Sequence, residues 1–148
     1  MGELPSAVLF CCTYNAIRSA MAEGIMKRLY GTRLYVDSVG VRKGEQDPFV
    51  AEVMDEIGID MSKHRPKTFD DLEDGCFDLV ISLSPEAQHK AVDLTRTSAC
   101  DVEYWPTFDP SIAEGSRDNR LDAYRTVRDD LMQRLRVRFP LHGLGRES

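Results

Sequence analysis

A chain of 148 residues, of which 42% are hydrophobic, has the size and composition of one globular domain with its own core. The formal net charge of −6 argues against nucleic acid as a partner. We expect no membrane association, because no apolar stretch is long enough to span a bilayer and no signal peptide is recognisable. The four cysteines have no metal-ligand spacing, which predicts a cytoplasmic protein without a metal site.

Apolar runs and helical patterns alternate along the chain. The apolar runs predict strands at residues 7–11, 34–39, 77–83 and 102–105. Apolar residues at helical spacing, with Pro or Gly near the ends, predict helices at about 19–30, 47–57, 84–94 and 120–139. Residues 107–119 are expected to form an irregular loop, and residues 141–148 a frayed tail.

This alternation predicts the fold class. Strands followed by helices, four times over, favour an α/β fold in which a parallel sheet is covered by helices on both faces. Neither a repeat nor a low-complexity linker interrupts the pattern, so residues 1–148 are predicted to form a single domain.

The stretch from Cys12 to Arg18 joins the first predicted strand to the first predicted helix. A five-residue loop at this position can turn its N–H groups inward, and the helix N-terminus adds a positive dipole end. Arg18 can bind two oxygens of a tetrahedral anion, and positive groups of this kind stabilise the thiolate form of cysteine. The alternative is a buried cysteine at a strand end and a solvated arginine. The strand-loop-helix context favours an oxyanion site with Cys12 as nucleophile.

Residues 12–23 read CTYNAIRSAMAE, which closely resembles the low-molecular-weight protein tyrosine phosphatases and the arsenate reductases that share their fold. Asp109 and Pro110 resemble the general-acid loop of this family, at a similar place near the end of the chain. The resemblance implies a four-stranded sheet of order 2-1-3-4. In that order Cys12 and Asp109 follow the carboxyl ends of their strands and face one crevice.

The resemblance also implies catalytic roles. Cys12 would attack phosphorus and form a cysteinyl-phosphate, while Arg18 binds the equatorial oxygens. Asp109 would protonate the leaving oxygen and then activate water. Without the loop motif, the residues alone favour a turn residue before Pro110 as the interpretation of Asp109. The implied phosphate-binding loop consists of Thr13, Tyr14, Asn15, Ala16, Ile17 and Arg18.

Four residues are implied to support this loop. Asn15 would hold an unusual backbone conformation, because Asn tolerates the left-handed region. Ser19 would donate a hydrogen bond to the thiolate, and Ser38 and His64 would tether Asn15. Without the resemblance, His64 would be interpreted as an ordinary surface or core histidine.

The sequence departs from the family pattern around the expected cleft. Tyr14 stands where Gly is usual, and Ile17 stands where many members carry a second loop cysteine. Ser111 follows Asp-Pro where the phosphatases often have tyrosine, and the loop after the second strand lacks an aromatic residue. In that loop, Arg42 and Lys43 are expected to favour a more acidic or smaller substrate.

These observations predict a cysteine-dependent phosphomonoester hydrolase, with protein tyrosine phosphatase as the specific activity and no cofactor. Its substrate would be a phosphorylated protein or a small phosphomonoester, and the protein would be a monomer or a weak dimer. One alternative is a single-cysteine arsenate reductase using an external thiol, since residues 84–94 contain no relay cysteine. The other is a non-catalytic phosphate-binding module.

Overall fold

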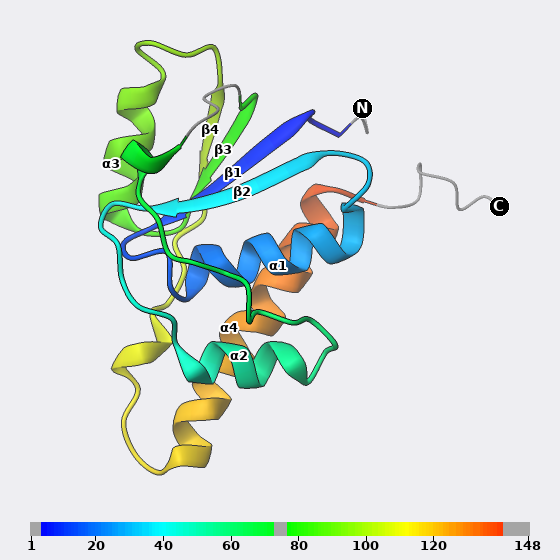
Figure 1. Cartoon of the computed structure of the whole chain (residues 1–148), viewed down its shortest axis with the longest axis vertical. Helices are drawn as coiled ribbons and strands as arrows, with labels where there is room; N and C mark the ends of the chain where they lie inside the picture. Colours follow the sequence, from blue (N-terminus) through cyan, green and yellow to red (C-terminus); the bar gives the residue numbers. More distant parts are fainter. Residues whose placement is uncertain (1–3, 73–76, 141–148) are drawn as a thin grey trace, which may run out of the picture.

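The fold is built on a four-stranded parallel sheet (Figure 1). The computed structural model describes residues 4–72 and 77–140, so the expected tail at 141–148 lies outside the described residues. The strand order is β2-β1-β3-β4, which confirms the predicted α/β architecture and the order 2-1-3-4. The strands are β1 (Ala7–Cys12), β2 (Tyr35–Gly40), β3 (Leu79–Ser82) and β4 (Asp101–Tyr104).

The central strand β1 is buried on both faces, as its continuous apolar sequence predicts. Successive side chains of a strand point to opposite faces of the sheet. Phe10 and Cys12 therefore belong to the larger hydrophobic cluster on one face, while Leu9 and Cys11 belong to the smaller cluster on the other. The two neighbouring cysteines thus face away from each other.

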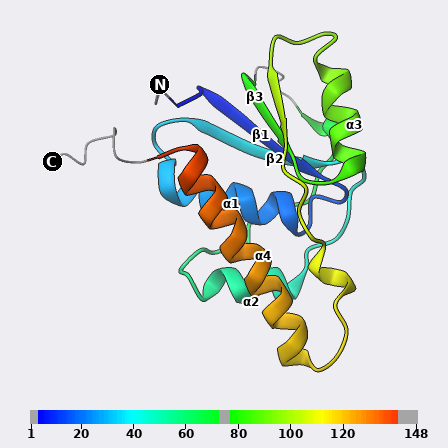
Figure 2. The ribbon, with the colours of Figure 1, turned by 180° about the vertical axis from the view of Figure 1, so that it is seen from behind.

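Helices cover both faces of the sheet, as predicted (Figures 1 and 2). Helix α3 lies on one face, against β1 and β3. Helices α1 and α4 lie together on the other face, and α2 packs against α4. None of the helices in the described part of the chain has the length and apolarity that a bilayer span needs. The helices are α1 (Arg18–Tyr30), α2 (Pro48–Asp55), α3 (Pro85–Leu94) and α4 (Arg117–Arg138).

Side-chain caps fix where three helices begin. Asp47 accepts a hydrogen bond from the N–H of Phe49, and Ser84 accepts one from Ala87, so α2 and α3 begin where the sequence predicts. Ser116 caps α4 in the same way, which starts this helix three residues before the predicted residue 120. The sequence analysis also missed two short 3₁₀ helices, η1 (Phe69–Asp71) and η2 (Pro110–Ile112).

A cluster of charged groups joins α2 to α4. The Glu56 carboxylate, just beyond α2, accepts hydrogen bonds from Arg125 (Nη2 to Oε2, 2.8 Å) and Arg128 (Nη1 to Oε1, 2.8 Å). Arg128 is buried and also donates to the carbonyl oxygen of Val53. Hydrogen bonds from the two arginines lower the pKa of Glu56 from 4.5 to about 2.

We expect Glu56→Gln to lower the free energy of unfolding at neutral pH by about 1 kcal/mol or less, because the pair is partly solvent-exposed. A carboxylate with a lowered pKa contributes stability above its unfolded-state pKa and loses it as the pH falls towards the folded-state pKa. The difference between wild type and variant should therefore shrink between pH 4.5 and about 2. Urea unfolding across this window measures it.

Asp130→Asn is a suitable control, because it removes an exposed carboxylate from the 3.4 Å pair with Arg134 on the same helix. If both variants lose unfolding free energy relative to wild type with the same dependence on pH, the role assigned to Glu56 is contradicted.

Candidate active site

The loop between β1 and α1 has the shape of an anion-binding cradle. Asn15, in the middle of this loop, has a φ of 57° and is the only non-glycine residue with positive φ among the described residues. Its backbone N–H points at the sulfur of Cys12, 3.3 Å away. Ile17, at the N-cap of α1, has no capping side chain, so none occupies the N–H groups of the first helical turn. Such free N–H groups favour a bound anion.

The end of β2 supports this loop from the side. Gly40 leaves no room for a side chain, because a Cβ there would lie 2.7 Å from the nitrogen of Asn15. The segment that follows pairs with the loop through backbone hydrogen bonds. These run from Val41 to Cys12 (3.0 Å), from Arg42 to Thr13 (2.8 Å) and from Gly44 to Tyr14 (3.0 Å).

Arg18 lies almost buried at the start of α1, with 9% of its surface exposed. Its Nη1 donates to the carbonyl oxygen of Thr107 (3.1 Å), and its Nη2 to the hydroxyl of Thr13 (3.5 Å). Nη2 also lies 4.0 Å from Oδ2 of Asp109. The guanidinium group is thus held between the anion-binding loop and the segment that follows β4.

Asp109 is a turn residue that also faces the cleft of Cys12. It caps η2, where its Oδ1 accepts hydrogen bonds from the N–H (3.0 Å) and hydroxyl (2.7 Å) of Ser111. It also lines a cleft of about 220 Å³ together with Cys12 and Arg18. The structure therefore brings all three candidate catalytic residues to one cleft. Its other walls include Tyr14, Ala16, Ile17, Gly44, Glu45 and Ser111.

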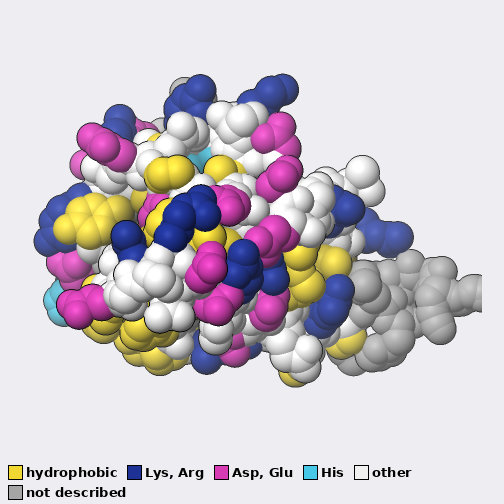
Figure 3. All heavy atoms as spheres, turned by 90° about the horizontal axis from the view of Figure 1, so that it is seen from below, with side chains coloured by type: hydrophobic (Ala, Val, Ile, Leu, Met, Phe, Trp, Pro, Cys, Tyr) yellow, Lys and Arg dark blue, Asp and Glu magenta, His cyan; other side chains and the backbone are white. Residues whose placement is uncertain are grey.

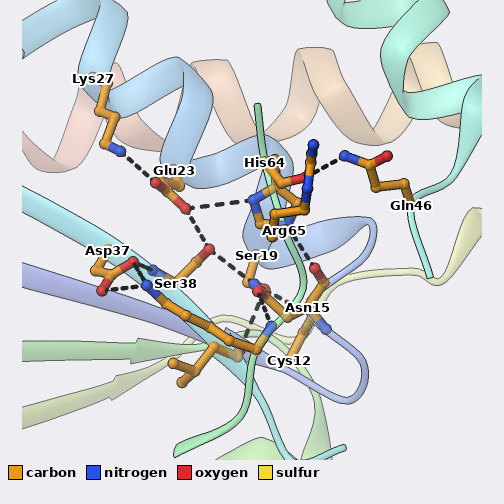
Figure 4. A network of polar contacts seen from close by, with 12 residues as sticks. Cys12, Asn15, Ser19, Glu23, Lys27, Asp37, Ser38, Gln46, His64 and Arg65 are labelled. Atoms are coloured by element: carbon orange, nitrogen blue, oxygen red, sulfur yellow. Dashed lines mark hydrogen bonds and ion pairs between the residues drawn. The ribbon is translucent and has the colours of Figure 1, made fainter. Parts of the chain in front are cut away.

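A network of polar contacts runs behind the Cys12 side chain (Figure 4). Ser19 Oγ lies 2.9 Å from the sulfur of Cys12. The Asn15 amide donates to the hydroxyl oxygens of Ser19 and Ser38, at 2.8 Å each. Ser19 accepts this bond, so its own hydrogen can go to the sulfur or to the carbonyl oxygen of Val39, 3.4 Å away. Ser19 thus lies beside the sulfur, and Ser38 lies beside the Asn15 amide.

The rest of the network holds both the backbone and the side chain of Asn15. His64 Nε2 lies 2.8 Å from the carbonyl oxygen of Asn15, so this nitrogen must carry the hydrogen. The Lys67 N–H donates to Oδ1 of Asn15 (3.0 Å). Glu23 accepts from Ser38 and pairs with Lys27, with His64 Nδ1 at 3.9 Å from its carboxylate.

The sequence analysis missed Glu23, Lys67 and Thr107. Glu23 lies one helical turn after Ser19, so this spacing was a usable signal. Lys67 and Thr107 contribute backbone atoms, and their side-chain types carry no information about those contacts.

The expected role of Arg42 and Lys43 in attracting an acidic substrate is not supported. Arg42 donates two hydrogen bonds to Glu86, at 3.0 and 2.7 Å, and lies 5.9 Å from the centre of the Tyr14 ring. Lys43 lies 3.8 Å from the Asp71 carboxylate. Carboxylates therefore pair with both cations, and neither residue lines the cleft.

Cys11 and Cys100 do not line the cleft. Cys11 is fully buried on the opposite face of the sheet, and this burial raises the pKa of its thiol well above the ordinary value. Cys100 precedes β4 and is partly exposed, whereas Cys76 lies outside the described residues. Among residues 4–72 and 77–140, no three His, Cys, Asp or Glu side chains are grouped to hold a metal ion.

The sequence matches the profile of the low molecular weight phosphotyrosine protein phosphatases over residues 7–138. The chain belongs to this family. An arsenate reductase of Halalkalibacterium halodurans is 33% identical over 132 residues, which cover 88% of this chain and 92% of the relative.

The chain resembles solved structures of both an arsenate reductase and a tyrosine phosphatase. The structure of an arsenate reductase in the phosphate-binding state has a TM-score of 0.69 at 27% identity, and covers 90% of this chain and 96% of its own. The low molecular weight protein tyrosine phosphatase of T. tengcongensis also has a TM-score of 0.69, at 28% identity, and covers 86% and 92%. The phosphatase family to which the chain belongs thus contains relatives with both names.

We expect Cys11 to resist alkylation in the folded protein, because its thiol is buried and its pKa is raised. Native protein treated with iodoacetamide should carry no label on Cys11, and unfolding in guanidinium should expose it. Peptide mass mapping distinguishes the sites. Added phosphate should protect Cys12 and leave Cys11 unchanged, whereas rapid labelling of native Cys11 would contradict its buried position.

Proposed function

We propose that this protein is a cysteine-dependent hydrolase of phosphomonoesters, with phosphotyrosine in proteins as its specific substrate. The observation that carries the proposal is the position of Asp109, which lines the same cleft as Cys12 and Arg18. A nucleophile, an anion-binding arginine and an acid are the groups that this hydrolysis needs.

In the first step, the substrate phosphate would lie in the loop, bound by its N–H groups and by Arg18. The Cys12 thiolate attacks phosphorus, and the bond from phosphorus to the ester oxygen breaks. Asp109 gives its proton to the departing oxygen, so the leaving group departs as a neutral alcohol or phenol. The product of this step is a cysteinyl-phosphate.

In the second step, Asp109 is a carboxylate and takes a proton from water. The water oxygen attacks phosphorus, and the bond from sulfur to phosphorus breaks. Inorganic phosphate leaves, and the Cys12 thiolate is restored next to Ser19. The cycle returns Asp109 to its acidic form and consumes one water molecule, with no need for a metal or an organic cofactor.

A second candidate function is arsenate reduction by an external thiol, and the names of the curated relatives favour it. Cys12 would bond to arsenic and expel water. A small thiol would then attack the Cys12 sulfur, which releases arsenite and leaves a mixed disulfide, and a second thiol molecule would reduce that disulfide. Residues 84–94 contain no cysteine, and Cys11 faces away, so this route uses no internal relay through either.

A non-catalytic phosphate-binding module is the third candidate function. Cys12 and Asp109 argue against it, because anion binding requires neither a thiol nor an acid. We further propose that the protein acts in the cytoplasm as a monomer or weak dimer.

Hydrolysis of p-nitrophenyl phosphate by wild-type protein should be lost in Cys12→Ser, because serine is a far weaker nucleophile. Arg18→Lys should nearly abolish it, because lysine cannot bind two oxygens in one plane. EDTA should leave the activity intact. Release of p-nitrophenol measures all three. Turnover that survives in Cys12→Ser would refute the mechanism.

Asp109→Asn should slow hydrolysis of alkyl phosphates by about 100-fold, the contribution typical of a general acid. The loss should be much smaller for p-nitrophenyl phosphate, whose leaving group needs little protonation. Ser111→Ala, which keeps the carboxylate, serves as the matched control. An equal loss for good and poor leaving groups would exclude Asp109 as the acid.

If the second candidate is right, arsenite should form from arsenate only when a small thiol such as glutathione is added. The reaction should stop in Cys12→Ser and continue in Cys11→Ser and Cys100→Ser. Measurement of arsenite and of oxidised thiol in equal amounts checks the balance. Dependence on Cys100 would point to an internal relay and against an external thiol.

A further inference from the structure

A second cavity of about 310 Å³ adjoins the cleft that holds Cys12. The two share Glu45 and Ser111 as lining residues, so they lie next to each other. The second cavity lies where α2 and η2 meet the first turns of α4. Figure 3 views this end of the molecule, where positive and negative side chains alternate and hydrophobic patches lie between them.

Aromatic side chains give this cavity a firm wall. The ring of Phe49 meets that of Tyr124 edge to face, with 5.3 Å between the ring centres. The Tyr124 hydroxyl donates to Oδ2 of Asp47 (2.7 Å), and Oδ1 of Asp47 caps α2 by accepting from the N–H of Phe49. Both carboxylate oxygens of Asp47 are thus already engaged by neighbours.

Two arginines from the start of α4 lie against Phe49. The guanidinium carbon of Arg120 is 4.9 Å from the ring centre, and that of Arg117 is 5.7 Å away. Arg117 pairs with Glu52, whereas no hydrogen bond or ion pair within the described residues engages the guanidinium group of Arg120. An arginine that stacks on a ring keeps the N–H groups on its edge available, and these match the two oxygens of a carboxylate.

The charged side chains of the two cavities differ. Arg18, Glu45 and Asp109 line the catalytic cleft, whereas Glu45, Asp47 and Arg120 line the second cavity. Because neighbours already bind both oxygens of Asp47, Arg120 is the positive group through which the second cavity can bind an anion. An acidic group directly beside the phosphate would meet Glu45, while one farther along would meet Arg120. Orthophosphate or arsenate would occupy only the catalytic cleft, so the second cavity suits a longer substrate.

We propose that Arg120 is a specificity residue that binds an acidic side chain of the phosphorylated protein segment, a few residues from the phosphorylated one. This inference rests on the proposed function and names its substrate class more closely. The Asp or Glu carboxylate accepts hydrogen bonds from the guanidinium edge, while the phosphorylated side chain enters the cleft of Cys12.

The test compares phosphotyrosine peptides in which a single Glu is moved through each flanking position of a neutral sequence. We expect kcat/KM to rise about threefold to fivefold at the position that reaches Arg120, the size typical of an exposed ion pair. High salt should reduce this preference. Arg120→Ala should abolish it, and Arg120→Glu should reverse it.

Arg134→Ala is the matched control, since it removes the same charge from α4 at a site that lines neither cavity. It should keep the preference. A wild type that hydrolyses p-nitrophenyl phosphate and every peptide equally well would overturn the inference and leave the proposed function standing. A wild type with no turnover on any of them would overturn the proposed function itself. An Arg120-dependent preference for small bisphosphates alone would replace the protein segment by a small molecule.

Discussion

The candidate site depends on the left-handed backbone conformation of Asn15. This conformation costs a residue with a side chain roughly 1–2 kcal/mol, so it persists only where other contacts outweigh the cost. Here they come from three parts of the chain: Ser19 on α1, Ser38 on β2, and His64 with Lys67 on the segment before η1. The anion-binding loop is therefore shaped by the folded domain more than by its own sequence.

The parallel sheet explains how distant segments reach this loop. Strand β1 pairs with β2 on one side and β3 on the other, so the chain connections diverge at its carboxyl end. Such a point in a parallel sheet leaves a crevice where ligands bind. Cys12 ends β1 at this crevice, and Asp109 reaches it from beyond β4, with the Thr107 carbonyl holding Arg18 between them.

The elements of the fold could be predicted because their signals are local. The apolar run before Cys12 predicts a buried strand at that position. Asp47 followed by Pro48 predicts the start of a helix there. The early start of α4 at Ser116 was missed because its first turn is polar throughout and shows no apolar period. The 3₁₀ turn after Asp109 falls within a stretch that the sequence analysis assigned to an irregular loop.

The sequence could indicate Cys12, Arg18 and Asp109 as candidates because their residue types carry the chemistry, and the structure brings the three to one cleft. The sequence could not show which charged side chains are already paired with distant residues. Arg42 looks like a substrate-binding residue in the sequence, but Glu86, 44 residues away, binds its guanidinium group. Thr107 and Lys67 contribute backbone atoms, and the type of a side chain does not indicate such contacts.

The two candidate functions, phosphatase and arsenate reductase, differ in how much of the surface beyond the cleft their substrates would contact. Both need Cys12 and the anion-binding loop, so those residues cannot separate them. Arsenate is small enough to leave the cavity at Phe49 and Arg120 without a role. A phosphorylated protein segment must run out of the cleft over neighbouring surface, and the second cavity adjoins the cleft at Ser111 and holds a stacked arginine. The position of this cavity is therefore an argument for the larger substrate.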